Sequence, residues 1–99
     1  MQPKTIELGE NSYVIRPLTL RQVQQLEPVL IASAKSEITN IQAAIQIVGI
    51  ALERDCAEAA KSLLDMETTP AEIGAAMAVV LVLGGFSNEV DPEGEAKAE

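Results

Sequence analysis

The chain has 99 residues and a formal net charge of −8 at pH 7, and its length fits a single domain. The acidic charge argues against binding to nucleic acid or to an anionic membrane surface, because both depend on clustered Lys and Arg. There is no histidine and only one cysteine, Cys56, which excludes histidine-based acid–base chemistry, histidine metal ligands and an internal disulfide. No basic and apolar targeting signal is visible at the N-terminus, so we expect a cytoplasmic protein.

Two short strands are predicted first. Apolar and polar residues alternate over residues 4–8 and 13–16, and a Gly-Glu-Asn-Ser turn signal lies between them at 9–12. This pattern predicts a β-hairpin over about residues 4–17 with a four-residue loop. A lone hairpin is marginal in water, so it either packs on the helices of its own chain or adds its edge to a partner's sheet.

The first helix is predicted to begin at a capping box, Thr19-Leu-Arg-Gln22, directly after Pro17. Pro28 interrupts this helix, because proline lacks an N–H and clashes with the preceding turn. One bent helix and two short helices therefore remain alternatives. The expected inner stripe of this helix consists of Leu20, Val23, Leu26 and Leu30, with Ile31 as a further candidate.

A second helix is predicted over residues 40–54, after the capping box that Thr39 and Gln42 form. Gly49 lowers its helix propensity, and we attribute the glycine to a close approach of another helix. An Ala-rich stretch over 55–65 predicts a shorter, more exposed helix that Leu63 and Leu64 anchor. The expected inner side of the second helix consists of Ile41, Ala44, Ile45, Val48 and Leu52, widened by Ile47 and Ile50.

The last helix is predicted over residues 70–83 and is interpreted as the centre of the fold. Thr69 is a suitable N-cap, Glu72 completes a capping box, and Gly84-Gly85 can supply the left-handed C-terminal residue. Its final turns are apolar on every side, and such a helix must be covered on every side. Either the chain covers it completely or one side binds a partner or a second copy.

These elements predict a mainly α protein, a small bundle of four to five helices with a short N-terminal β-hairpin. We expect one domain over residues 1–86 and a disordered acidic tail over 87–99, because the tail has five acids, one Lys and a single large apolar residue, Val90. The tail alone carries a formal charge of −4, half the total.

No stretch of the sequence predicts catalytic, cofactor-binding or metal-binding residues, and we expect no enzyme activity. Glu53, Asp55 and Glu58 lack the glycine-containing loop of a calcium site. Cys56 has no histidine to act as its base, and Gly84-Gly85 ends a helix where a phosphate cradle would begin one. The predicted partner-binding residues are apolar and lie on the two most apolar helices: Val79, Val82, Leu83, Ile47 and Ile50.

Three features together resemble the tail assembly chaperones of long-tailed bacteriophages. They are the short hairpin, the sequence Arg16-Pro-Leu-Thr19 that leads directly into the first helix, and the apolar helix from Thr69 to the terminal Gly-Gly-Phe86. The resemblance covers most of residues 1–86. Pro28 within the first helix is a departure from what the resemblance leads us to expect.

The resemblance implies a non-enzymatic role. Such proteins bind the long, largely helical tape-measure protein and keep it soluble while tail-tube subunits polymerise around it. The implied partners are the tape-measure protein, tail-tube subunits and further copies of the chain, without nucleic acid or membrane. The alternatives are a generic interaction or regulatory module of the adaptor or antitoxin kind, and an acyl-carrier-like protein. Against the carrier, Ser62 follows Lys61, whereas a carrier needs Asp-Ser-Leu at a helix start.

Overall fold

The computed structural model describes residues 2–86; Met1 and the predicted acidic tail, residues 87–99, lie outside the described residues. The described residues form the predicted mainly helical bundle with an N-terminal hairpin. Its elements in chain order are β1 (Lys4–Leu8), β2 (Asn11–Ile15), α1 (Leu20–Ala34), α2 (Asn40–Asp55), α3 (Ala57–Ser62), the 3-10 turn η1 (Leu63–Asp65) and α4 (Pro70–Leu83). The predicted helix over 55–65 is thus divided into α3 and η1.

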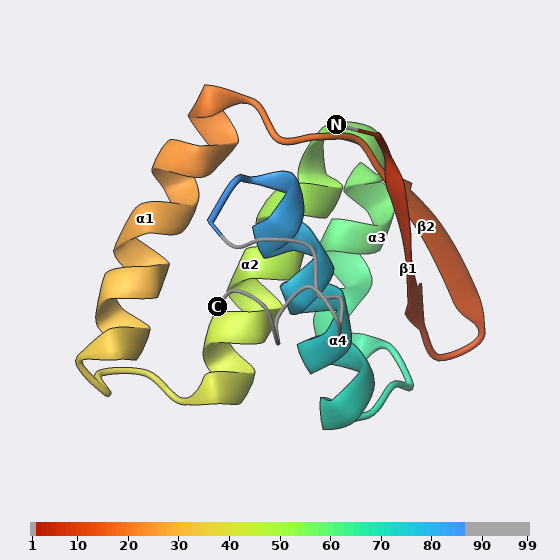
Figure 1. The fold of residues 1–99 in the computed structure, drawn as a ribbon. Helices are drawn as coiled ribbons and strands as arrows, with labels where there is room; N and C mark the ends of the chain where they lie inside the picture. Colours follow the sequence, from red (N-terminus) through yellow and green to blue (C-terminus); the bar gives the residue numbers. More distant parts are fainter. Residues whose placement is uncertain (1, 87–99) are drawn as a thin grey trace, which may run out of the picture.

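The helix at the centre of the bundle is α2. It packs against α1, α3, α4 and η1 and touches β2, whereas α1 rests chiefly on α2 at one border of the molecule (Figure 1). The hairpin lies at the opposite border, with β1 packed against α4. Taking α4 as the centre was therefore wrong: α4 is one of several elements that cover α2.

The hairpin is antiparallel, with Leu8 paired to Asn11 and Lys4 to Ile15. Its loop has two residues, Gly9-Glu10, in place of the predicted four. Gly9 has φ +66°, the left-handed value that a two-residue hairpin turn with glycine in first place requires. The short loop lets the second strand begin at Asn11, and the hairpin buries a continuous inner face that consists of Ile6, Leu8 and Ile15.

Local hydrogen bonds begin the helices where the sequence predicts. At α1, the Thr19 hydroxyl accepts from the Gln22 N–H and the Gln22 side chain accepts from the Thr19 N–H; Thr39 and Gln42 repeat this at α2. The α1 helix is continuous through Pro28, which decides between the two alternatives. Pro28 is exposed, so water can reach the backbone around it.

The end of α4 follows the predicted glycine pattern. The Phe86 N–H donates to the Leu81 carbonyl at 2.9 Å and the Gly85 N–H to the Val82 carbonyl at 3.0 Å. Gly85 has φ +82°, so it is the left-handed residue of a Schellman cap. The N–H of Leu18 also donates to the Leu83 carbonyl, which ties the segment before α1 to this end of α4.

Several predicted inner residues lie at the surface. Leu20 is 84% exposed, Leu64 is 78% exposed and Ile41 is 49% exposed. In α2 the buried side is rotated toward small residues, which let neighbouring helices approach closely; it consists of Ala43, Ala44, Ile47, Val48, Ala51 and Leu52. The expected close approach at Gly49 is also absent, because a Cβ there would lie 3.6 Å from Leu63 Cδ2, an ordinary contact.

Candidate binding surface

The five predicted partner-binding residues do not form one exposed patch. Ile47 is 0% exposed, Leu83 3% and Val82 8%. Val79 and Ile50 are half-buried and pack at the margin of the core. Ile47 and Leu83 belong to the hydrophobic core of this chain, so they are unavailable to a partner in this conformation. Within the described residues, only Val79 and Ile50 of the five keep substantial exposure outside that core.

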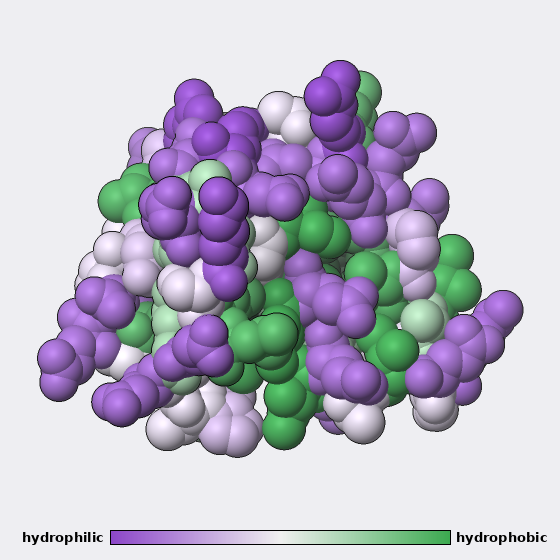
Figure 2. Space-filling view, turned by 180° about the vertical axis from the view of Figure 1, so that it is seen from behind, coloured by the Kyte–Doolittle hydropathy of each residue, from purple (hydrophilic) through white to green (hydrophobic). Residues whose placement is uncertain are grey.

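An apolar groove lies instead where α2 begins, beside η1 and the first turn of α4. Its volume is about 180 Å³. Two of its residues, Ile41 and Leu64, are among the large apolar side chains that the chain leaves exposed. Seen from behind in Figure 2, hydrophobic atoms lie at the lower centre of the molecule and at its right, between hydrophilic ones. The groove is lined by Ile41, Ile45, Leu63, Leu64, Met66, Thr68, Thr69, Pro70 and Ile73.

The sequence contained a partial signal for this groove. Leu63 and Leu64 are adjacent on a short helical segment, so they point in different directions and both cannot face the same core. Leu63 is buried and Leu64 is exposed. Ile41 lies in the first turn of α2, shortly before the buried side begins at Ala43 and Ala44. The exposure of Ile41 depends on how α2 rotates against α4, which a single helical pattern does not determine.

Two acidic residues alternate along the chain with residues that line the apolar groove. Asp65 and Glu67 flank Met66, and both are exposed, but neither is among the residues that line the groove. Met66 also lines a second hollow of about 270 Å³, together with Glu10 and Glu67.

The Glu72 carboxylate fixes the hairpin turn against the segment that carries Met66. Its Oε1 accepts from the Gly9 N–H at 2.9 Å and from the Thr68 hydroxyl at 2.6 Å. These hydrogen bonds, from Thr68 first and from Gly9 second, lower the pKa of Glu72. The predicted capping box at Thr69 is therefore half wrong: Thr69 accepts from the Glu72 N–H, but the Glu72 side chain binds the distant hairpin.

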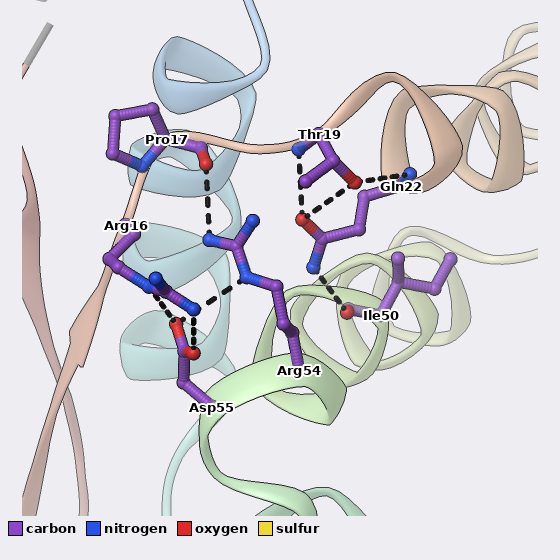
Figure 3. Close-up of polar contacts among 7 residues, drawn as sticks. All are labelled: Arg16, Pro17, Thr19, Gln22, Ile50, Arg54 and Asp55. Carbon is purple, nitrogen blue, oxygen red and sulfur yellow. Dashed lines mark hydrogen bonds and ion pairs between the residues drawn. The ribbon is translucent and has the colours of Figure 1, made fainter.

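At the other end of α2, a polar cluster holds the segment between the hairpin and α1 (Figure 3). Arg16 forms an ion pair with Asp55, with Nε donating to Oδ2 at 2.9 Å. Arg54 donates to the Pro17 carbonyl at 3.1 Å. The hydrogen bond from Arg16 is the largest cause that lowers the pKa of Asp55. We use "polar cluster" for Arg16, Pro17, Thr19, Gln22, Ile50, Arg54 and Asp55.

The polar cluster has a structural role. The Gln22 side chain, which is 5% exposed, accepts from Thr19 and donates to the Ile50 carbonyl at 3.2 Å, so it joins α1 to α2. A hollow of about 520 Å³ opens beside it, lined by Gln22, Arg54 and four further residues. Arg54 Nε lies 3.6 Å from the Asp55 carboxylate. Arg16 and Arg54 both contact Asp55, and the buried Arg54 Nε has no hydrogen-bond partner among the described residues.

The described residues contain no group of three or more Cys, Asp or Glu side chains that could hold a metal ion. Cys56 is half-buried where α2 ends and the six-residue α3 begins. Ser62 lies at the end of α3, and its hydroxyl donates to the Glu58 carbonyl at 3.1 Å. A phosphopantetheine attachment serine would instead lie at a helix start, so this placement disfavours the carrier alternative.

No helix within residues 2–86 is long and apolar enough to cross a membrane. Comparison of the chain with protein-family models, with curated proteins and with solved structures finds no match. We take the apolar groove as the candidate binding site, because its lining is mainly apolar and it leaves Ile41 and Leu64 exposed.

Proposed function

We propose that this protein is a non-enzymatic assembly chaperone of the phage tail type, which binds the tape-measure protein in the host cytoplasm. In this role it keeps the client soluble while tail-tube subunits polymerise. The tape-measure protein is proposed as the client because the hairpin, the segment 16–19 and the last helix resemble those of tail assembly chaperones. The apolar groove supplies the mode of binding.

The observation that carries the proposal is the apolar groove with Ile41 and Leu64 exposed at its rim. A folded chain of this size gains by burying large apolar side chains, at roughly 25 cal/mol for each Å² removed from water. An exposed apolar groove on a monomer marks a place where another molecule completes the burial. Helices α2 and α4 and the turn η1 provide walls on rigid elements, which suits an amphipathic helix laid into the groove.

The client that fits this groove has two properties. It presents apolar residues at helical spacing of three and four, which occupy the groove floor, and it carries Lys or Arg beside them. The basic residue would pair with Asp65 or Glu67, which are exposed on the segment that carries Met66. A long helical client that is unprotected in solution exposes many such stripes, so several copies of the chaperone can cover one client.

Two experiments test the proposal. The neighbouring DNA should contain a very long, helix-rich open reading frame just downstream of this gene, with a slippery sequence near the end of the gene itself. If no such frame is present, the tape-measure assignment is wrong. Where the frame is present, its product should be soluble when co-expressed with this chain, should co-purify with it, and should precipitate when expressed alone.

The second candidate is a generic adaptor or regulatory module, and the same groove favours it if the client is a different amphipathic helix. Co-purification distinguishes the two: an adaptor would leave the solubility of the tape-measure protein unchanged. The carrier alternative predicts that a phosphopantetheinyl transferase adds the mass of a pantetheine arm to the chain. We expect no mass change, because Ser62 lies at the end of α3.

A further inference from the structure

The hairpin is a two-stranded sheet, so neither of its edges has a neighbouring strand, but β1 packs against α4. In a two-residue hairpin the pair next to the loop is hydrogen-bonded and the pairs alternate from there. Leu8–Asn11 and Ile6–Tyr13 are therefore the hydrogen-bonded pairs. The N–H and C=O groups of Ser12 and Val14 point away from β1, and within residues 2–86 no backbone hydrogen bond to them is present.

The β2 edge also lacks the usual protection against pairing. Exposed edges are commonly blunted by Lys, by Pro, by a bulge or by a covering helix. The five residues of β2 contain no charge and no Pro, and the strand pairs with β1 without a bulge. β2 forms the outer border of the molecule in Figure 1, and no helix lies beyond it. Val14 is 57% exposed on the outer face of this strand.

In an antiparallel pairing of β2 with β2 of a second copy, residues whose backbone groups point away from β1, such as Ser12 and Val14, must lie opposite residues of the same kind. Three registers satisfy this, and they are centred on Ser12, on Tyr13 or on Val14. The register centred on Tyr13 pairs Ser12 of each copy with Val14 of the other, which gives four backbone hydrogen bonds. The hairpins then form one four-stranded sheet, with both helical bundles on the same face.

Charge selects among these registers. Only the register centred on Tyr13 places Glu10 of one copy opposite Arg16 of the other, at both ends of the pairing. Both residues are exposed. Arg16 uses Nε and Nη2 for Asp55, and its guanidinium has further N–H donors for a second carboxylate. The register centred on Ser12 instead places Glu10 opposite Val14.

We propose that two copies of this chain associate through their β2 edges, in the antiparallel register centred on Tyr13 and closed by Glu10–Arg16 ion pairs. This interface lies at the opposite border of the molecule from α1 and does not use the apolar groove. It therefore stands independently of the client and of the proposed function.

A pair of matched substitutions tests the edge. Val14 and Thr5 face each other across the hairpin, and both point to its outer side, but only Val14 belongs to β2. Sedimentation across a concentration series should show a dimer for the wild type. Val14→Lys should raise the dissociation constant of that dimer by at least about tenfold, whereas Thr5→Lys leaves it unchanged.

The register is tested by charge and by crosslinking. Glu10→Lys should weaken the dimer, whereas Glu7→Lys on β1 should not. In a Cys56→Ser background, Tyr13→Cys should form an intermolecular disulfide on mild oxidation, because the paired Cα atoms would lie within disulfide range at the two-fold axis. Thr5→Cys in the same background should form no such crosslink. The crosslinking experiment also tests the proposed interface if Val14→Lys fails to fold.

A wild type that remains monomeric at every concentration would overturn the proposal, as would a dimer that Val14→Lys and Thr5→Lys weaken equally. Loss of client binding in Val14→Lys with a monomeric wild type would show that the edge takes a partner's strand. The double variant Ile41→Ser/Leu64→Ser should dimerise normally, so failure of this interface and failure of the proposed function are distinguishable.

Discussion

At the end of α2 that carries Arg54 and Asp55, the chain completes its own contacts: ion pairs and hydrogen bonds join α2 to the segment before α1. At the beginning of α2, Ile41 and Ile45 line a groove that no other part of residues 2–86 fills. Exposed apolar side chains gain free energy when another molecule covers them. The polar cluster joins elements of the fold, and the apolar groove is the surface that we propose for binding.

The largest expected change in stability distinguishes a core residue of α2 from a residue of the groove. Leu52→Ala should lower the free energy of unfolding by about 2–5 kcal/mol, because Leu52 is fully buried and the truncation leaves a cavity. Leu64→Ala removes the same atoms, yet it should change that free energy by only about 0.5 kcal/mol or less. Denaturant titration of both variants checks this. Equal losses would mean that Leu64 belongs to the core.

The next effect concerns the hairpin turn beside the groove. A Cβ on Gly9 would lie 2.3 Å from the Glu67 carbonyl oxygen, and Gly9 also has a positive φ. Gly9→Ala should therefore cost more than the roughly 1–2 kcal/mol of the left-handed conformation alone. Gly85→Ala is the matched control, since Gly85 has a positive φ and a Cβ added there would meet nothing within 4 Å. If thermal unfolding gives equal losses, the turn does not press against the groove wall.

A smaller, stabilising effect is expected midway along α2. Gly49→Ala should raise the free energy of unfolding by about 0.5–1 kcal/mol, because alanine has the higher helix propensity and its Cβ meets Leu63 at an ordinary distance. Gly74→Ala in α4, where the added Cβ has open space, should stabilise the protein similarly. A loss of stability at Gly49 alone would show that η1 approaches α2 more closely than this structure has it.

The two ends can also be compared through pH. The pKa values of Glu72 beside the groove and Asp55 in the polar cluster are both lowered by folding. A lowered carboxyl pKa stabilises the fold above the unfolded pKa, and this stabilisation is lost as the pH falls through the folded value. Glu72→Gln and Asp55→Asn should each flatten the loss of stability in acid. Unfolding curves across the acid range measure this, and an unchanged acid slope in either variant would contradict the assigned contacts.

Local signals predicted most of the fold. Thr19 with Gln22, Pro70 after Thr69, and Gly85 before Phe86 act within one helical turn, so the sequence alone places these helix ends. The partner of Glu72 could not be predicted this way, because Gly9 lies 63 residues away along the chain. The Glu72 side chain could accept either from its own helix start or from the hairpin, and the tertiary packing of the hairpin determines which.

The site was harder to predict for a related reason. The α2 helix is apolar on several sides, so its pattern allowed either Ile41 or Ile47 to face the core. Packing against α4 buries Ile47 and leaves Ile41 at the groove. We predicted partner-binding residues from the most apolar helices, and residues such as Leu83 in those helices are buried in the core. The candidate binding surface consists of apolar residues that packing leaves exposed, and identifying them requires the three-dimensional structure.

The most direct test is the affinity for a helical segment of the client, measured by titration with four forms of the protein. The double variant Ile41→Ser/Leu64→Ser alters the groove, and Leu20→Ser/Ile31→Ser alters comparably exposed apolar residues on α1. The wild type and the α1 variant should bind alike, and the groove variant should bind at least about tenfold more weakly while remaining folded. The fourth form, Val14→Lys, should bind the segment as the wild type does. Undiminished binding by the groove variant would contradict the account.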